Sequence, residues 1–292
     1  MSSGNYHSVL FYQYVDIEDT EALLARERAV CEVLGLTGRM IIAEEGVNAT
    51  LEGSAEAISR YIAQLKKDKR FIKTDYKVTP GSGRLFPRLS IKIRDEIVAS
   101  HLPKEIDPTV DTGVHLAPEV LRSWFEGGKD FEIIDMRNDY EYAVGHFRNS
   151  HESGMKNFRD LEAVTPQFEH LKDKPVLTVC TGGVRCEKAS AYLKAQGFKE
   201  VYQLHGGIHR YMEKYPGQDF KGALYTFDGR VTMHFGGERE IVGRCTYCNA
   251  PSEAYADCLD DLCGAHFIAC DACRDAEGRA GCPQHRTTAS VI

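Results

Sequence analysis

The first 98 residues alternate between the apolar spacing of strands and that of helices. Apolar positions three or four apart predict helices over residues 20–34 and from Ser54 onward, the second with Ile58, Ile62 and Leu65 on one face. Short apolar or alternating runs predict strands at residues 9–15, 39–43, 47–51, 74–78 and 89–93. This β-α-β-β-α-β order is typical of the ferredoxin-like (acylphosphatase-like) fold.

A second α/β unit is predicted after residue 116. Pro118 suits the first turn of a helix that a Gly-Gly pair ends at residues 127–128. Asn138 and Glu141 have the spacing of a capping box, in which each side chain caps the backbone of the other. Apolar runs predict strands at residues 131–135, 175–179 and 201–204. Because these strands alternate with helices, we expect a mainly parallel sheet with both faces covered.

The chain of 292 residues is long enough for two α/β domains and an appendage. The predicted bounds are a ferredoxin-like domain at 1–98, a proline-containing linker at 99–116, a central domain at 117–222 and a cysteine-rich segment at 223–292. No apolar run has the roughly 18 residues that a membrane span needs, and the first residues do not resemble a secretion signal. We therefore expect a soluble, cytoplasmic protein with no membrane partner.

The charge distribution changes the picture of possible partners. A formal net charge of −7 argues against nucleic acid, but residues 60–94 contain eleven Lys and Arg and only two acids, Asp68 and Asp75. This basic segment has the charge density to neutralise the phosphates of a nucleic acid. A solvated helix face followed by a charged strand explains the same pattern, and the two interpretations remain open.

The run Cys180-Thr181-Gly182-Gly183-Val184-Arg185 follows a predicted strand and precedes a predicted helix. Its glycines allow successive amides to converge on the sulfur, and the helix N-terminus and Arg185 add positive charge. These effects stabilise a thiolate, so Cys180 is the candidate nucleophile. The alternative is a buried cysteine beside a structural turn. Only four residues separate Cys180 from Arg185, one fewer than in cysteine-dependent phosphatases, which favours sulfur chemistry over phosphorus chemistry.

The chain resembles a known family at several separate motifs. Asp135-Met136-Arg137, Gly145-His146-Phe147, the Cys180 loop and Leu204-His205-Gly206-Gly207-Ile208 are similar, in this order, to the signature segments of a rhodanese domain. With Glu45-Gly46-Val47-Asn48, the whole run from Cys180 to Ala189 and the cysteine-rich tail, the chain resembles the rhodanese-domain tRNA uridine hydroxylases. The resemblance implies oxygen-dependent hydroxylation of the wobble uridine of tRNA to 5-hydroxyuridine.

The resemblance also implies roles for single residues. Cys180 would be the essential cysteine, passing through a persulfide, and Arg185 would orient the loop and pair with anions. Asp135 and Arg137 would brace the loop through hydrogen bonds. Cys186 is either a resolving thiol for an oxidised Cys180 or an inert cysteine in the first helical turn. The implied partners are tRNA and a sulfur or electron donor, with molecular oxygen as co-substrate.

Two other functions remain open for the same residues. A sulfurtransferase acting on thiosulfate or on a carrier persulfide would use the same loop, but it would leave the basic segment without a task. A non-catalytic RNA- or protein-binding scaffold would not need Cys180 and Arg185. Tyr12 and Tyr14 lie at strand spacing, so either could stack on a base, although packing in the core is the usual role of strand aromatics.

Seven of the ten cysteines lie between residues 245 and 282. Cys245-x-x-Cys248 and Cys270-x-x-Cys273 are spaced like the two halves of a closed, tetrahedral zinc site, which is typical of structural zinc. Further potential ligands leave other ligand sets, or a second site, open: Cys258, Cys263, His266, Cys282 and His285. Iron–sulfur ligation and a set of reduced or paired cysteines also remain open.

Overall fold

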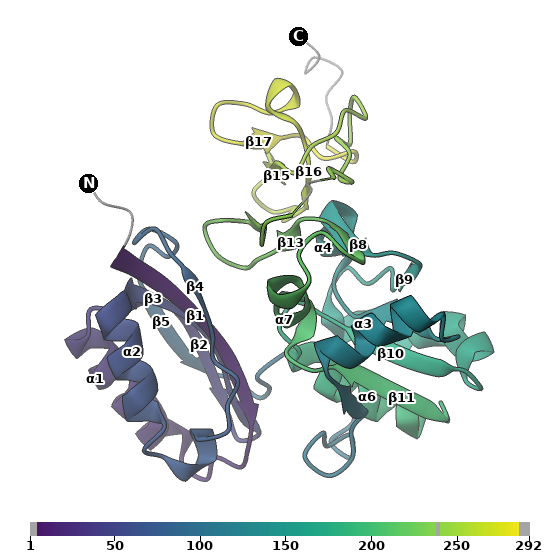
Figure 1. Ribbon diagram of the computed structural model, residues 1–292. Coiled ribbons are helices and arrows are strands. Elements are labelled where there is room, and N and C mark those ends of the chain that lie inside the picture. Colours follow the sequence, from purple (N-terminus) through teal and green to yellow (C-terminus); the bar gives the residue numbers. More distant parts are fainter. Residues whose placement is uncertain (1–4, 238–239, 286–292) are drawn as a thin grey trace.

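The computed structural model describes residues 5–237 and 240–285. Its N-terminal domain has two helices on one face of a sheet (Figure 1). The elements are β1 (Tyr6–Tyr14), α1 (Thr20–Val33), β2 (Thr37–Ala43), β3 (Gly46–Ser54), α2 (Ala55–Leu65), the 3-10 turn Lys69–Phe71, β4 (Lys77–Pro80) and β5 (Leu89–Ile93). The strand order is β4-β1-β3-β2-β5. The first four strands confirm the ferredoxin-like fold, and β5 adds a fifth strand parallel to β2.

The two faces of this sheet have different tasks. On β1, Val9 and Phe11 are fully buried in the core beneath α1 and α2. The alternate positions Ser8, Leu10 and Tyr12 lie on the other face, because successive strand residues point to opposite sides. That second face carries no helix of its own and faces the central domain.

The central domain is built on a parallel five-stranded sheet with the order β6-β11-β10-β7-β9, as predicted. Its strands are β6 (Val114–Leu116), β7 (Glu132–Asp135), β8 (Gly145–Phe147, outside this sheet), β9 (Ser150–Glu152), β10 (Pro175–Val179) and β11 (Glu200–Leu204). Its helices are α3 (Pro118–Gly127), α4 (Asp139–Val144), α5 (Leu161–Val164), α6 (Val184–Ala195) and α7 (Gly207–Lys214), with 3-10 turns at Phe158–Asp160 and Thr165–Leu171. The capping box of Asn138 and Glu141 is present at α4. Strand β6 takes up the last three residues of the expected linker.

The C-terminal part lies against α4 at one end of the central domain (Figure 1). Strand β12 (Phe220–Gly222) pairs with β8, and β13 (Leu224–Tyr225) pairs with β14 (Thr232–Met233). The cysteine-rich segment has a small sheet of β15 (Tyr255–Cys258), β16 (His266–Ile268) and β17 (Arg279–Ala280), with a 3-10 turn at Asp271–Cys273. Within the described residues, no helix has the length and apolar character needed to cross a membrane.

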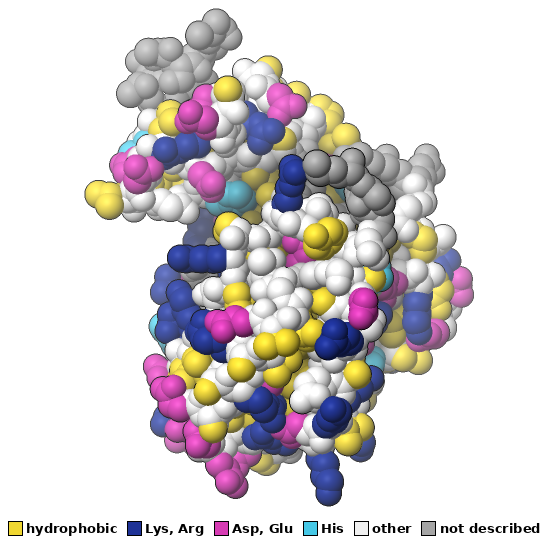
Figure 2. Space-filling model, turned by 90° about the vertical axis from the view of Figure 1, so that its left-hand side faces the viewer, with side chains coloured by type: hydrophobic (Ala, Val, Ile, Leu, Met, Phe, Trp, Pro, Cys, Tyr) yellow, Lys and Arg dark blue, Asp and Glu magenta, His cyan; other side chains and the backbone are white. Residues whose placement is uncertain are grey.

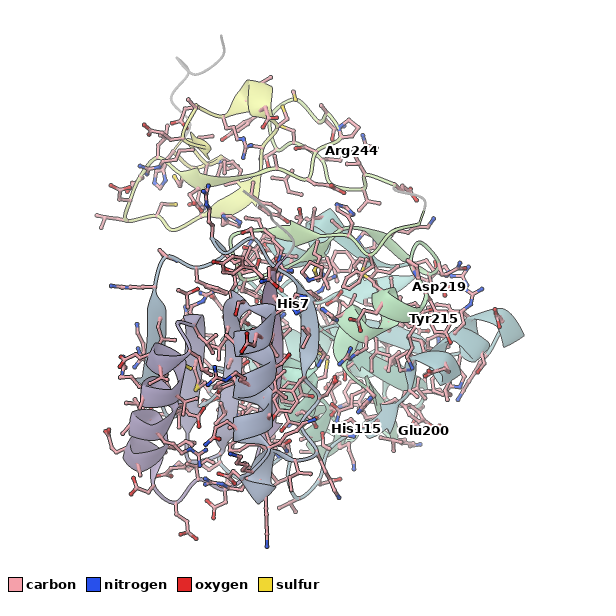
Figure 3. All side chains as sticks on the ribbon, turned by 60° about the vertical axis from the view of Figure 1, so that its left-hand side comes forward. His7, His115, Glu200, Tyr215, Asp219 and Arg244 are labelled. Atoms are coloured by element: carbon pink, nitrogen blue, oxygen red, sulfur yellow. The ribbon has the colours of Figure 1, made fainter. Side chains whose placement is uncertain are left out.

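Charged side chains join the N-terminal and central domains. Lys188 on α6 is buried between two carboxylates of the N-terminal domain, with Nζ 2.8 Å from Glu45 and 2.9 Å from Glu96. Arg210 on α7 binds Asp75 at 2.6 Å. Figure 3 shows the resulting arrangement, with His7 on β1 in front of the central domain and Arg244 in the cysteine-rich segment above both. Glu45, the first residue of the motif Glu45-Gly46-Val47-Asn48, is therefore part of the interface between the two domains.

The Gly206-Gly207 turn before α7 supports the loop that follows β10. The Ile208 amide donates to the Cys180 carbonyl at 2.9 Å, and the His209 amide donates to the Thr181 carbonyl at 3.0 Å. Gly207 has φ +69°, and a Cβ added there would lie 2.7 Å from the Cys180 and Thr181 carbonyl oxygens. Only glycine fits this position, because any side chain would push the loop away from the turn.

We expect Gly207→Ala to lower the free energy of unfolding more than Gly197→Ala does. Both glycines have positive φ, but a Cβ at Gly197 would meet nothing within 4 Å. The control variant, Gly197→Ala, should therefore lose only about 1–2 kcal/mol of unfolding free energy, from backbone strain. Gly207→Ala should lose an additional ~1–3 kcal/mol from overpacking. Urea unfolding measures both; equal losses would contradict the close packing of this turn against the loop.

Candidate active site

Cys180 follows directly after β10, the middle strand of the central sheet. Side chains at this position lie at the carboxyl edge of a parallel sheet, where α/β proteins bind their ligands. The Gly183 amide donates to the Cys180 sulfur at 3.2 Å, and α6 begins at the next residue. The predicted loop geometry, with a sulfur facing backbone amides at a helix N-terminus, is present.

The surroundings of Cys180 favour its thiolate form. Burial raises the pKa of the thiol, but a hydrogen bond from Cys186, the charge of Arg185 and the amides of both residues lower it more. The net result is a pKa of about 6, compared with the ordinary value of 9.0. A thiol whose pKa lies below 7 is mostly a thiolate at neutral pH, and the thiolate is the nucleophilic form of cysteine.

Arg185 is held by a carboxylate that the sequence did not single out as part of the site. Its guanidinium forms two hydrogen bonds to Glu141 on α4, at 2.5 and 2.8 Å, and both side chains are buried. Glu141 also accepts the Asn138 amide at 3.0 Å as the capping-box acid. The capping-box spacing was the only sequence signal for Glu141, and it indicated a helix start rather than a partner for Arg185.

Asp135 and Arg137 form a fully buried ion pair with an N–O distance of 2.6 Å. Arg137 also donates to the carbonyls of Glu141 at 3.2 Å and Gly145 at 2.6 Å. Arg137 therefore binds the backbone in the middle of α4 and at the residue that follows its C-terminal end. Its hydrogen bonds reach the Cys180 loop through Glu141, whose side chain binds Arg185, and the bracing role of the pair stays a prediction.

Cys186 is fully buried beside Cys180. Burial, followed by its hydrogen bond to the Cys180 sulfur and the charge on that sulfur, raises the pKa of Cys186 well above its usual value. It is therefore a thiol that donates to a neighbouring thiolate. A thiol in this position can stabilise Cys180, and it can also resolve an oxidised Cys180.

A cavity of about 600 Å³ lies between the two domains, with the Cys180 loop as part of its wall. The open face of the N-terminal sheet forms the opposite wall. Basic side chains from both domains line it: Arg39, Lys77, Lys92, Arg94, Arg159, Arg185 and Arg230. Apolar lining comes from Leu10, Met40 and Phe227, among others. The cavity thus combines an apolar interior with a basic lining above a nucleophilic cysteine.

The N-terminal domain covers the Cys180 loop closely. A Cβ at Gly182 would lie 3.1 Å from a Leu10 methyl, and one at Gly183, whose φ is +108°, would lie 2.7 Å from the Tyr12 hydroxyl. Tyr12 donates to Glu187 at 3.1 Å and Tyr14 donates to the Val184 carbonyl at 3.2 Å. Both tyrosines are therefore interface residues at the start of α6, and Tyr12 also lines the cavity.

The basic segment 60–94 does not form one face. Lys77 is buried and paired with Asp75 at 2.7 Å, while Lys92 and Arg94 are exposed and line the cavity. Arg60 and Lys67 belong to the helical side, away from the central domain. Figure 2 views the molecule from that side and shows Lys and Arg mixed with Asp and Glu. Of this segment, Lys77, Lys92 and Arg94 line the cavity, together with basic side chains from elsewhere in both domains.

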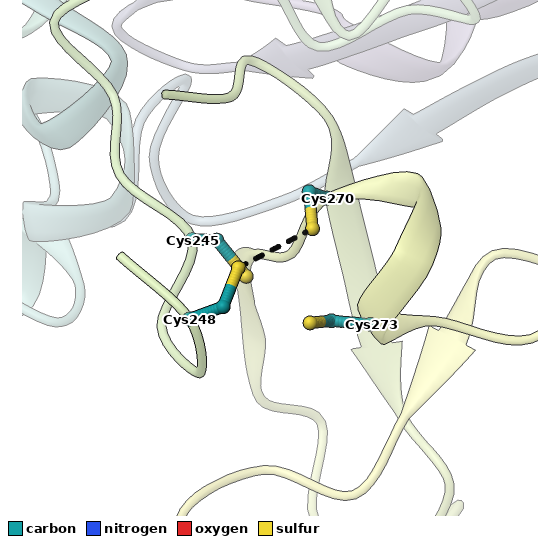
Figure 4. Close-up of side chains that lie close together, drawn as sticks. All are labelled: Cys245, Cys248, Cys270 and Cys273. Atoms are coloured by element: carbon teal, nitrogen blue, oxygen red, sulfur yellow. Dashed lines mark hydrogen bonds between the residues drawn. The ribbon is translucent and has the colours of Figure 1, made fainter. Parts of the chain in front are cut away.

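Cys245, Cys248, Cys270 and Cys273 converge in the cysteine-rich segment (Figure 4). Their sulfur atoms all lie within 4.8 Å of one another, and those of Cys248 and Cys270 are 3.6 Å apart. All four cysteines are free of disulfide bonds. Four thiols in this arrangement can hold a metal ion with no open coordination position, which is the form of a structural site.

Three family models match successive parts of the chain. They are described as UPF0176 acylphosphatase like domain (residues 6–97), Rhodanese-like domain (117–214) and Rhodanase C-terminal (221–285). A solved rhodanese-like domain from Anabaena is 21% identical over 44% of this chain and 92% of its own, with a TM-score of 0.33. Fold and site thus define an α/β protein that joins an acylphosphatase-like domain to a rhodanese domain.

Curated relatives match almost the whole chain. A protein of Aster yellows witches'-broom phytoplasma is 44% identical, covering 91% of this chain and 88% of its own length. Proteins of Cytophaga hutchinsonii (40% identical; 92% and 86%) and Arthrobacter sp. (38%; 94% and 97%) are similar over comparable lengths. All three are named tRNA uridine(34) hydroxylase. The chain belongs to this family and is an oxidoreductase built on a rhodanese domain.

We expect the alkylation rate of Cys180 by iodoacetamide to rise with pH to a plateau, with a midpoint near the pKa of about 6. Because Arg185 lowers this pKa, Arg185→Gln should move the midpoint upward and slow alkylation at pH 7. Arg159→Gln removes an exposed charge from the same cavity and serves as the matched control, with no shift expected. Peptide mass spectrometry distinguishes Cys180 from the other cysteines. An unchanged midpoint in a folded Arg185→Gln protein would contradict this electrostatic account.

Proposed function

We propose that the protein hydroxylates the wobble uridine of tRNA to 5-hydroxyuridine, with molecular oxygen as co-substrate and Cys180 as the essential residue. The observation that carries the proposal is the position of Cys180, whose thiolate is favoured, in the wall of a basic cavity between two domains. The name shared by relatives that match almost the full length supports the reaction and the substrate.

The size and lining of the cavity suit a single nucleotide. Small-molecule sites commonly have volumes of roughly 300–1,000 Å³, and the cavity of about 600 Å³ lies within this range. A base must leave the stack to reach an enclosed reactive group, and anticodon-loop bases are accessible for this. Lys92 and Arg94 at the cavity would bind the flanking phosphates, which fix position without reading sequence.

The reaction that we propose replaces the C5–H bond of uridine by C5–OH. With molecular oxygen, one oxygen atom enters the product and the other leaves as water, so the balance requires two electrons and two protons. A reducing partner, such as a thiol or another electron donor, must therefore supply them. The Cys180 thiolate can accept the outer sulfur of a donor persulfide, whose S–S bond breaks as the donor leaves as a thiolate. The Gly183 amide and Arg185 would stabilise the negative charge of the resulting Cys180 persulfide.

We propose further that Cys245, Cys248, Cys270 and Cys273 hold a structural zinc ion. The mutual distances of the four sulfurs support a tetrahedral site. Bound zinc would supply folding free energy to a segment with a small apolar core, and it would take no part in the chemistry at Cys180.

Deleting the gene should abolish 5-hydroxyuridine derivatives in cellular tRNA where no parallel pathway operates. Wild-type protein should restore them, whereas Cys180→Ser should not. Cys31→Ser, which changes a buried cysteine in α1 far from the loop in the fold, is the control that should restore them. Nucleoside mass spectrometry after growth under ¹⁸O₂ should place one heavy oxygen in the product. Unchanged 5-hydroxyuridine on deletion, together with turnover of thiosulfate without tRNA, would favour a sulfurtransferase.

A double variant, Lys92→Ala with Arg94→Ala, should weaken tRNA binding and reduce the dependence of log Kd on log salt by about one for each lost phosphate contact. Arg60→Ala with Lys67→Ala removes the same charge from the helical side of the same domain. This matched control should bind nearly as wild type does. Filter binding at several salt concentrations measures both, and equal losses would show that charge alone, without its position at the cavity, attracts the tRNA.

A further inference from the structure

The cysteine-rich segment contains a second group of metal-ligating side chains. Cys258, Cys263, Cys282 and His285 place their ligand atoms within 4.8 Å of one another. None of them belongs to the cluster around Cys245, and none contacts the cavity at Cys180. The three cysteines are free of disulfide bonds. This group takes no part in the proposed reaction. The reason why these four side chains lie together must therefore be sought in the ligand chemistry of thiols and imidazole.

The distances within this group match the edges of a tetrahedral metal site. With Zn–S near 2.3 Å and Zn–N near 2.0 Å, two sulfurs lie about 3.8 Å apart and a sulfur and a nitrogen about 3.5 Å apart. The sulfurs of Cys263 and Cys282 are 3.7 Å apart. His285 Nδ1 lies 3.5 Å from the sulfurs of both Cys258 and Cys282. A disulfide would bring two sulfurs to about 2.05 Å, so the separation is that of ligands around an ion.

Neighbouring groups are arranged as they are around protein-bound metals. The Asp260 amide donates to the Cys258 sulfur at 3.4 Å, which favours the thiolate. The Asp260 carboxylate lies 3.6 Å from His285 Nε2. A carboxylate at the far nitrogen of a ligating histidine orients the ring and makes the near nitrogen a better ligand. Asp260 is thus placed to support His285 from outside the cluster.

We propose that Cys258, Cys263, Cys282 and His285 form a second structural zinc site, interleaved with the first. In chain order, the first and third ligand pairs, Cys245/Cys248 and Cys270/Cys273, hold one ion. The second and fourth pairs, Cys258/Cys263 and Cys282/His285, hold the other. The two ligand pairs of each ion are thus separated in the chain by a ligand pair of the other ion. Binding both ions would therefore cross-link the whole cysteine-rich segment as one unit.

The small sheet of this segment explains why two ions are needed. The apolar cluster within this segment contains three buried alanines, Ala256, Ala269 and Ala280, with Tyr247 and Phe267 partly buried beside them. Tyr255 and Ile268 of the same sheet are also buried, but they pack in a separate cluster that includes Val144 of α4. So small a core supplies little folding free energy, and metal binding can supply the rest. The second site lies at one end of β15 and β17, where Cys258 pairs with Ala280. At the other end of β15, Tyr255 donates to the Tyr140 carbonyl on α4 at 2.5 Å.

Native mass spectrometry of the full-length protein, purified without chelators, tests the proposal. We expect two zinc ions per chain, and elemental analysis should show zinc without iron or labile sulfide. Cys263→Ser should lose one ion, and Cys248→Ser, the matched change in the first site, should also lose one. After cobalt substitution, the Cys263→Ser protein should show the spectrum of four thiolates, and the Cys248→Ser protein that of three thiolates and one imidazole.

His285→Cys keeps a metal ligand at the same position, so it tests the second site even if the variants that remove a ligand fail to fold. We expect it to bind two ions, with a cobalt spectrum in which both sites have four thiolates. One zinc per chain in the wild-type protein, an iron–sulfur cluster, or two ions retained in Cys263→Ser would each overturn the second site.

Discussion

A buried thiolate is stable only where positive charge and hydrogen-bond donors replace the water it has lost. Around Cys180 these are Arg185, the Gly183 amide and the Cys186 thiol. Arg185 is itself a buried charge, so it depends on Glu141, and Glu141 lies on α4. Arg137, which is paired with Asp135, in turn donates hydrogen bonds to backbone carbonyls of α4 and of the residue after it. The reactivity of one sulfur therefore depends on a chain of paired charges that extends through the central domain.

The site is complete only where the domains meet. Leu10 and Tyr12 lie close over Gly182 and Gly183 of the Cys180 loop, and Gly183 also has the positive φ that favours glycine. The same sheet face contributes Lys92 and Arg94 to the cavity. The Cys180 loop by itself has the amide donors and the positive charge to bind a small sulfur anion. The N-terminal domain adds a second wall with basic side chains, so that a cavity of about 600 Å³ lies between the two domains, and this addition supports the proposed tRNA substrate over a small anion.

The cysteine-rich segment also contacts α4, the helix on which the position of Arg185 depends. Its Tyr255 stacks on His266, with ring centroids 4.7 Å apart, and bonds to the backbone of α4, the helix that carries Glu141. Because the apolar cluster within this segment is small, the metal binding that we propose for its two groups of ligands would fix the shape of the segment. The proposed metal sites and the environment of Cys180 would thereby be connected through one short helix, α4.

Local patterns in the sequence determined much of this protein. Apolar periodicity predicted most strands and helices, and Ser54 and the Asn138–Glu141 box begin their helices as expected, because these features depend on neighbours within a few residues. The Cys180 loop was recognisable for the same reason, since its amides, glycines and arginine are consecutive. The spacing of the Cys245 and Cys270 pairs likewise indicated a metal site.

Contacts between distant parts of the chain could be decided only by the tertiary structure. Glu141 and Arg185 are 44 residues apart, and nothing near Glu141 in the sequence marks it as the partner of Arg185. The separation of the basic segment into a cavity side and a helical side follows from how the sheet docks. The pairing of Cys258 and Cys263 with Cys282 and His285 follows from how short strands align. Spacing identifies ligands and charges, but only folding determines which of them meet.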